Sequence, residues 1–257
     1  MRFEVKSLGL KFGDVCLFND VSFSCESGSL TVIKGKNGAG KTCLLQCLCH
    51  VIPKHFSGVV EGKVELSTSD GAMTVDRILP RHFGYLMQEP DKQLCFPFIE
   101  EELFFGAENV GRDVAEFNKD YELLIEMFPL LKWDNIETNA LSFGQKKVLL
   151  FSSLILKNPD VYLLDEPVAG LSDDFRERFT ELIAMLRERG KIVIVAEHSD
   201  YFDSVCDDVL YVHTDDSPIV FASSAKPIQK FPSRGGVATQ LTGWLNDYNN
   251  QSNQNLR

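Results

Sequence analysis

One eight-residue segment near the N-terminus has the composition of a loop that binds phosphate groups. It matches the pattern G-x-x-x-x-G-K-[ST], in the order Gly35, Lys36, Asn37, Gly38, Ala39, Gly40, Lys41 and Thr42. Glycines at these positions let backbone N–H groups point at phosphate oxygens, and a following helix adds positive potential from its N-terminus. Lys41 would reach the β- and γ-phosphates of a nucleotide, and the Thr42 hydroxyl would bind Mg²⁺. The alternative, a glycine-rich turn without a ligand, leaves the apolar run before the motif and the helical pattern after it unexplained.

Two acidic residues end a second apolar run. Asp165 and Glu166 follow four apolar residues that begin at Val161. Because buried strands do not carry carboxylates in their middles, we expect this pair at the carboxyl end of a strand, where α/β sheets bind ligands. Asp165 would hold Mg²⁺ through its water shell, and Glu166 could polarise an attacking water. Acids at strand ends are common, so the pair gains its weight from the phosphate loop upstream.

A sheet with crossing helices must position these residues. The apolar patterns predict strands within 1–33, a buried helix from Lys41 to Ile52, an antiparallel strand pair at 58–66, a strand at 82–88, mostly helices from about 92 to 156, a strand at 160–167, an amphipathic helix from Phe175 to Leu186 closed by Gly190, and a strand at 191–198. The last strand–helix–strand unit is a βαβ crossover, which implies a parallel sheet.

A third motif lies before the acidic strand and consists of Leu141, Ser142, Phe143, Gly144 and Gln145. Together with the phosphate loop it resembles the signature of the ATP-binding cassette (ABC) ATPases, usually written LSGGQ. Further matches follow in the family's order: Phe12 looks like the aromatic that stacks on adenine, Gln88 like the Q-loop glutamine, Ser172 and Asp173 like part of the D-loop, and His198 like the switch histidine. Taken singly, Phe12 could belong to the core and His198 could be structural.

The resemblance implies an ATPase that uses ATP and Mg²⁺. The nucleotide-binding residues would be Phe12 and the segment from Gly35 to Cys43, and the metal-binding residues Thr42, Gln88 and Asp165. Glu166, His198 and Gln88 would be catalytic. In the family two subunits meet head to tail, so the signature Leu141–Gln145 of one subunit would close on ATP held by the other.

The implied fold is α/β: a P-loop NTPase of the ABC ATPase type, with a parallel RecA-like core sheet, an antiparallel β subdomain and an inserted helical subdomain. We predict a single ABC ATPase domain over residues 1–257. Its parts would be the nucleotide-binding core with the antiparallel β subdomain at 1–87 and 157–222, the helical signature subdomain at 88–156, and a C-terminal segment at 223–257 with a polar tail beyond about 245.

A narrower resemblance is to the ATPases of energy-coupling-factor and cobalt-type importers. The segments LMQEPDKQL, EEELFFGAEN, LSFGQKK and AEHS carry it, and so does HVIPKHFSGVVEGKV. Phe143 in the signature fits this subgroup. Two positions depart from the family pattern: Ser172 stands where the D-loop usually has Asp, and Val148 stands where Arg is usual. The first departure puts the D-loop's contact with the opposing phosphate loop in doubt, so we expect low activity from the subunit alone.

Composition narrows the classes of partner. The 257 residues carry 26 Lys and Arg against 37 Asp and Glu, a formal charge of -11. An acidic surface argues against a nucleic acid bound through its phosphates and against anionic lipid headgroups. The seven cysteines form no CxxC pair, which favours buried small side chains over a zinc ribbon or a redox site. The chain lacks a signal-peptide core and any run of about 18–20 apolar residues, so we expect a soluble, cytoplasmic protein.

These observations predict the ATP-hydrolysing motor subunit of a membrane ABC transporter, an importer of the energy-coupling-factor or cobalt type, peripheral at the cytoplasmic face of the membrane. Its partners would be integral membrane subunits and a second ATPase subunit, identical or different. The membrane partner would dock around Gln88–Phe98, where Phe96 and Phe98 could receive a helix or could pack into the chain's own core. The alternative is a soluble ABC ATPase that acts as an ATP-dependent assembly or regulatory switch without transport. The transported substrate cannot be read from this chain, because selectivity lies in the membrane partners.

Overall fold

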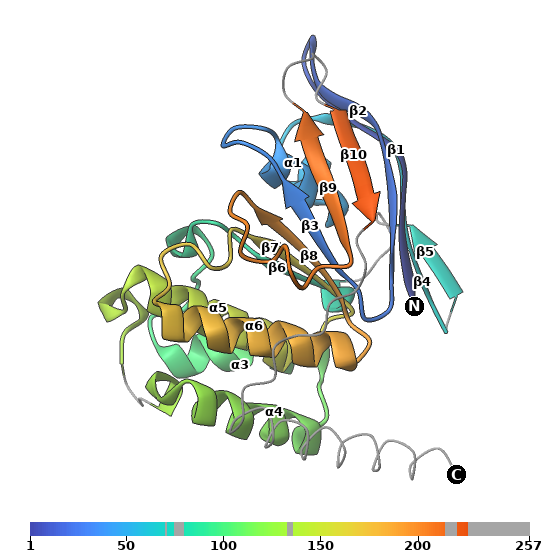
Figure 1. The fold of residues 1–257 in the computed structure, drawn as a ribbon. Coiled ribbons are helices and arrows are strands. Elements are labelled where there is room, and N and C mark those ends of the chain that lie inside the picture. The colour runs from blue at the N-terminus through green and yellow to red at the C-terminus, as the bar shows by residue number, and fades with distance from the viewer. Residues whose placement is uncertain (70, 75–79, 133–135, 214–219, 226–257) are drawn as a thin grey trace.

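The computed structural model describes residues 1–69, 71–74, 80–132, 136–213 and 220–225 (Figure 1). In chain order the strands are β1 Arg2–Phe12, β2 Val15–Glu26, β3 Leu30–Lys34, β4 Val59–Thr68, β5 Gly71–Thr74, β6 Phe83–Leu86, β7 Val161–Asp165, β8 Ile192–Glu197, β9 Asp208–His213 and β10 Val220–Ala225. The helices are α1 Lys41–Leu48, α2 Val51–Lys54, α3 Ile99–Val110, α4 Val114–Met127, α5 Phe143–Lys157 and α6 Asp173–Glu188. Short 3₁₀ turns lie at Pro80–His82, Pro90–Lys92, Pro129–Lys132 and Thr138–Ala140.

The larger sheet is mostly parallel. Within the described residues its strand order is β10-β9-β3-β8-β7-β6, and only β10 runs antiparallel to its neighbour. Strands β3, β7 and β8 are buried along their whole length, which is why their sequences read as continuous apolar runs. The predicted βαβ crossover is confirmed, because β7 and β8 pair in parallel with α6 between them.

A smaller antiparallel sheet has the order β2-β1-β4-β5. The prediction of a strand pair at 58–66 is wrong, because this segment belongs to the single strand β4, which pairs with β1 and β5. Gly62 explains the error. Its φ of +88° lets the chain pass close to the carbonyl of Ser7, where a Cβ would lie 2.3 Å from that oxygen. The glycine therefore marks an irregularity within one strand, where the ladder with β1 shifts register, and not a turn between two.

Helix α1 lies between the two sheets. Its buried residues Leu44, Leu45 and Leu48 share one hydrophobic cluster with residues of β1, β3, β7 and β8. The helix is shorter than predicted. It ends at Leu48, His50 takes a left-handed conformation, and Ile52 falls in the short element α2 with extended backbone angles.

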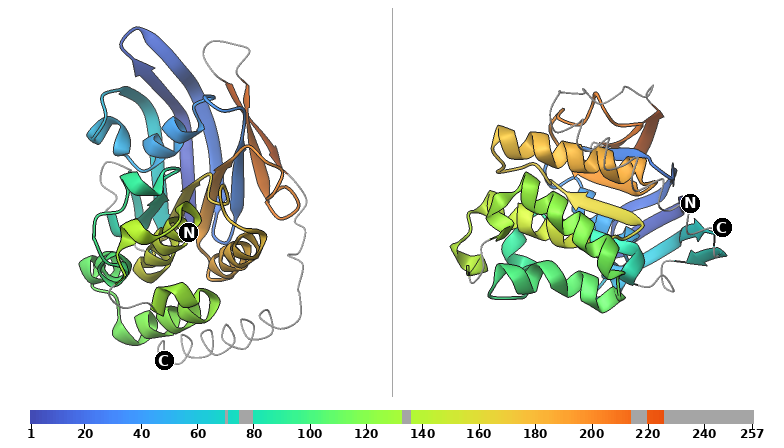
Figure 2. Two further views of the ribbon diagram at one scale, coloured as in Figure 1. Left: turned by 90° about the vertical axis from the view of Figure 1, so that its left-hand side faces the viewer. Right: turned by 90° about the horizontal axis from the view of Figure 1, so that it is seen from below.

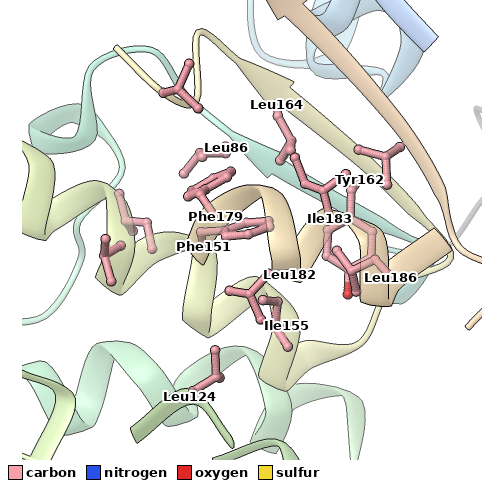
Figure 3. Close-up of a cluster of buried hydrophobic side chains, with 14 of the residues drawn as sticks. Leu86, Leu124, Phe151, Ile155, Tyr162, Leu164, Phe179, Leu182, Ile183 and Leu186 are labelled. Carbon is pink, nitrogen blue, oxygen red and sulfur yellow. The ribbon is translucent and has the colours of Figure 1, made fainter. Parts of the chain in front are cut away.

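Helices α3 to α6 lie at one end of the molecule, away from the antiparallel sheet (Figures 1 and 2). Phe151 of α5 stacks on Phe179 of α6 with ring centroids 3.9 Å apart, and both pack with Tyr162 of β7 in a second hydrophobic cluster (Figure 3). Burial of each such ring contributes roughly 2–3 kcal/mol. The middle of α5 is therefore held against the strand that ends in Asp165.

The fold is that of a P-loop NTPase with a parallel core sheet, an antiparallel sheet and a group of helices inserted between β6 and β7, as the sequence predicts. Strands β5, β9 and β10 were not predicted. The subdomain boundaries at 88 and 156 stay predictions, and the polar tail beyond residue 245 lies outside the described residues. In the described part of the chain, no helix is both long and apolar enough to span a membrane.

Candidate functional site

The phosphate loop joins β3 to α1. Gly38 and Gly40 have φ values of +78° and +85°, and Gly40 is the residue before the first helical turn. Such angles favour glycine, which has no Cβ to clash. The Lys41 ammonium donates to the carbonyl oxygens of Gly35 (2.7 Å) and Lys36 (3.1 Å). Lysine has three N–H donors, so these two bonds leave one for a phosphate oxygen.

Thr42, in the first turn of α1, is hydrogen-bonded to Asp165 at the end of β7. The Thr42 hydroxyl donates to Asp165 Oδ2 at 2.7 Å. Burial raises the pKa of the Asp165 carboxyl, and the Thr42 hydrogen bond acts against that rise. A hydroxyl and a carboxylate are the hard oxygen donors that Mg²⁺ prefers. The two residues therefore fit the metal-binding role predicted for them.

Glu166 holds an unusual backbone conformation at the end of β7. Its φ is +46°, in the left-handed region, which costs about 1–2 kcal/mol for a residue with a Cβ. Its side chain is nearly buried, and Oε2 accepts a hydrogen bond from Gln88 Nε2 at 3.0 Å. The conformation thus directs the carboxylate toward the residue predicted from the Q-loop.

His198 stands beside the same carboxylate. Its Nδ1 is 3.5 Å from Glu166 Oε1 and 3.1 Å from Glu197 Oε1. Glu197 Oε1 also accepts the backbone N–H groups of His198 (2.9 Å) and Ser199 (3.1 Å). Two carboxylates thus lie near Nδ1, and 51% of the His198 side chain is exposed, so the ring is accessible to a substrate.

A cavity of about 300 Å³ lies over the phosphate loop. Its lining consists of Leu17, Asn37, Gly38, Ala39, Gly40, Lys41, Thr42, Cys43, Gln88 and Glu166. Phe12 does not contribute to this lining. It ends β1 with 38% of its surface exposed, so its role against a nucleobase stays a prediction. Leu17 was not predicted, because an apolar residue in the strand β2 looks the same whether it faces the core or a ligand.

The signature motif forms the start of α5. Ser142 and Gln145 make a reciprocal capping box, in which the Gln145 N–H donates to Ser142 Oγ and the Ser142 N–H donates to Gln145 Oε1. Ser142 and Phe143 are exposed, whereas Leu141 and Gly144 are buried. None of the five motif residues lines the cavity over the chain's own phosphate loop.

The D-loop residues begin α6. Ser172 is the N-cap, and its hydroxyl accepts the N–H of Phe175 at 3.4 Å. Asp173 is almost fully exposed and lies 3.5 Å from Arg176. Val148, the other departure from the family pattern, is buried in the hydrophobic cluster beside α6.

Sequence reasoning did not assign a role to Lys147. Its side chain is fully buried, and its ammonium donates to the carbonyls of Glu166 (2.5 Å) and Ala169 (3.1 Å). Burial lowers the pKa of Lys147 to about 8, against the attraction of nearby carboxylates. The available signal was a lysine among the apolar residues of a helix, four positions before Phe151.

Comparisons with known proteins agree on one family. A family model described as "ABC transporter" matches residues 18–169. A protein of Archaeoglobus fulgidus named as an ABC transporter ATP-binding protein is 31% identical over 85% of this chain and 73% of its own. The energy-coupling factor transporter ATP-binding protein EcfA1 of Thermotoga maritima is 28% identical over 82% and 78%. The solved structure of cbiO1 from Clostridium perfringens, described as part of the ABC transporter complex cbiONQ, is 28% identical, with a TM-score of 0.63 over 81% and 83%.

Proposed function

Because this chain belongs to the ABC transporter family as an ATP-binding subunit, we propose that it is the motor of an importer of the energy-coupling-factor or cobalt type. It hydrolyses ATP at a site shared by two subunits and moves an integral membrane partner. EcfA1 and cbiO1, which carry transporter names, support this subgroup. The protein then works as a peripheral subunit at the cytoplasmic face of the membrane.

The observation that carries the proposal is the set of contacts around Glu166. Gln88 and His198 lie against its carboxylate, and the Thr42–Asp165 pair lies at the same edge of the sheet. Four segments far apart in the sequence thus meet at or beside the cavity over the phosphate loop. If these polar side chains only stabilised the fold, they would have no reason to gather beside the phosphate loop.

Phosphoryl transfer to water needs in-line geometry and neutralised charge more than covalent help. Lys41 and the backbone amides of Gly38 to Thr42 bind the β- and γ-phosphates. Thr42 and Asp165, with Gln88, would hold Mg²⁺, which when bound neutralises phosphate charge. Glu166 orients the attacking water and takes its proton. His198 lies beside the Glu166 carboxylate and positions it relative to the γ-phosphate.

The signature acts on the ATP of a second subunit. Ser142 and Phe143 are exposed and lie outside the cavity of their own chain. The start of α5 adds free N–H groups and the positive end of a helix dipole, both suited to a phosphate. Two subunits related head to tail would each complete the other's site, which explains why the motif does not line the cavity over the phosphate loop of its own chain.

The membrane partner docks around the segment Gln88–Phe98, where this segment meets helices α3 and α5. A cavity of about 680 Å³ lies there, and its lining includes Gln93 and Cys95, Phe105 of α3 and Leu150 of α5. The rings of Phe96 and Phe105 pack at a tilt of 52°, with centroids 4.8 Å apart. The Glu102 carboxylate accepts the N–H groups of Cys95 and Phe96 at 2.9 and 3.0 Å, which fixes this part of the lining. Phe96 therefore packs against a residue of the cavity lining, and Phe98 is exposed at the start of α3.

Complementation between two inactive variants tests the shared site. Glu166→Gln removes the base but keeps the signature, and Ser142→Arg blocks the signature but keeps the base. Each should be nearly inactive in phosphate release. An equal mixture should regain about a quarter of the wild-type rate, since half of random dimers pair the two variants and each such dimer has one complete site. A mixture that stays inactive, while wild type is active, would refute the shared site.

Ser172, which stands where the D-loop usually has Asp, provides a second test. Ser172→Asp restores the family's carboxylate and should raise the basal ATPase rate of the isolated protein.

The membrane partner is tested by expressing the tagged chain in its native cells and asking whether an integral membrane protein co-purifies. Isolation of only soluble protein, with full ATPase activity, would instead favour the alternative of an assembly or regulatory switch.

A further inference from the structure

The side chain of Lys147 donates two hydrogen bonds to one turn of the backbone. It lies in the first turns of α5 with no exposed side-chain surface. Its ammonium donates to the carbonyl oxygens of Glu166 at 2.5 Å and Ala169 at 3.1 Å. A buried ammonium requires hydrogen-bond partners, and both of these belong to the turn that follows β7.

That turn contains the left-handed residue Glu166. Its N–H donates to the Ala196 carbonyl at 2.9 Å, and its own carbonyl accepts from Lys147 and from the N–H of Ala169 at 3.2 Å. A residue with a Cβ stays at a φ of +46° only where its surroundings hold it. The bond from Lys147 is the one side-chain contribution among these three.

We propose that Lys147 is a positioning residue, which holds the backbone of Glu166 so that its carboxylate points at Gln88 and His198, and which transmits movement of the signature to that carboxylate. The inference rests on the proposed function, because it assigns Glu166 the role of general base. Loss of the bond would let Glu166 relax toward ordinary backbone angles. The carboxylate would then leave the place where it orients water.

The link to the signature is made by close packing at the start of α5. A Cβ at Gly170 would lie 2.8 Å from the ring of Phe143, and a Cβ at Gly144 would lie 2.9 Å from the Gly170 carbonyl oxygen. The Lys147 ammonium lies 5.0 Å from the centroid of the Phe143 ring. The signature and the turn from Glu166 to Gly170 therefore move together. When the signature contacts ATP of the second subunit, the displacement reaches the base of its own subunit through Lys147.

The test compares two lysines that each donate to a backbone carbonyl, although Lys191 also lies 3.7 Å from the Asp160 carboxylate. Lys191 is also largely buried, its pKa is lowered by burial, and its ammonium donates to the carbonyl of Asn158 at 3.2 Å. Lys147→Met should lower kcat roughly 10–100-fold, as expected when a catalytic group is misplaced by about 1 Å. The affinity of the monomer for ATP, measured with a fluorescent analogue, should stay near wild type. Lys191→Met should leave both unchanged.

A rescue variant separates positioning from packing. Lys147→Arg keeps N–H donors for the two carbonyls and should recover part of the kcat that Lys147→Met loses. If Lys147→Met does not fold, as judged by its thermal transition, Lys147→Gln provides a neutral side chain that can still donate one bond. The kcat of Lys147→Gln should be below that of wild type.

Two results would overturn the inference. One is an unchanged kcat in folded Lys147→Met or Lys147→Gln, and the other is an equal loss of kcat in Lys191→Met. Glu166→Gln, assayed in parallel, distinguishes the two levels of the proposal. If that variant hydrolyses ATP normally, the proposed function itself fails. If it is inactive while Lys147→Met is not, only the positioning role fails.

Discussion

A buried ion triad joins the helices α3 and α4 to the end of α6. Asp120 of α4 accepts hydrogen bonds from Arg112, just after α3, and from Arg189, just after α6, the latter at 2.6 Å. The Arg112 guanidinium also donates to the carbonyls of Ile155 and Leu156 at the end of α5, at 3.2 and 2.7 Å. One carboxylate thus compensates two guanidinium groups where four helices meet.

Asp120→Asn removes the charge and keeps the size of the side chain. The side chains of Arg112, Asp120 and Arg189 are 6%, 2% and 4% exposed, so water cannot compensate the two cations that remain. Breaking a buried pair of this kind costs about 3–5 kcal/mol. For a chain of this size each kcal/mol lowers Tm by about 2–4 °C, so we expect a decrease of roughly 5–20 °C.

Thermal unfolding followed by circular dichroism measures this effect, with Asp113→Asn as the control. Asp113 is the N-cap of the same helix, where its exposed carboxylate accepts the N–H groups of Ala115 and Glu116 at 3.0 Å. Asparagine is an equally good N-cap, so the same chemical change should leave Tm within about 2 °C of wild type. Equal Tm values for the two variants would show that the triad does not hold the helices to the core.

Further predictions concern the site. Glu166→Gln should slow hydrolysis by about 10²–10⁴-fold in a phosphate-release assay, with ATP affinity retained. Lys41→Ala should abolish ATP binding in a nucleotide titration, whereas Phe12→Ala should weaken it by about 1–3 kcal/mol, the scale of stacking on a base; unchanged affinity would place that ring in the protein's own packing. Burial lowers the pKa of Lys147 to about 8, so folding disfavours its charged form. The unfolded state then holds this proton at pH values where the folded state has lost it. The free energy of unfolding of wild type, relative to that of Lys147→Met, should therefore rise by about 1 kcal/mol per pH unit between pH 8 and pH 10. Urea titrations of both proteins at each pH measure this difference.

The sequence predicts those elements whose local pattern and tertiary role agree. Strands β3, β7 and β8 are covered on both faces, so their apolar runs alone identify them. The pattern fails at Gly62, because glycine marks both turns and irregular strands, and only the partner strand decides between them. Helix α1 ends early because His50 adopts a left-handed conformation, which no apolar period reveals.

The candidate site divides in the same way. Lys41, Thr42 and Asp165 occupy fixed places in motifs, so their proximity could be expected from the sequence. The left-handed φ of Glu166 and its bond to Lys147 depend on how α5 packs against the turn after β7. A lysine within an apolar helix indicates only that something must compensate its charge. The partner is a backbone carbonyl, and carbonyls leave no mark in a sequence.

Three motifs coincide with helix starts, and this affects how substitutions in them must be interpreted. Helix α1 begins after Gly40, and α5 and α6 begin at the caps Ser142 and Ser172. A helix start presents free N–H groups and positive potential, so the same residues that suit a phosphate also stabilise the helix. Ser142→Arg therefore removes a cap worth about 0.5–2 kcal/mol in addition to blocking the signature, and its loss of activity counts only if Tm shows a folded protein. Ser172→Asp keeps a cap, because aspartate caps as well as serine. Because either residue can cap α6, a change in ATPase rate on that substitution would bear on the proposed contact with a second subunit.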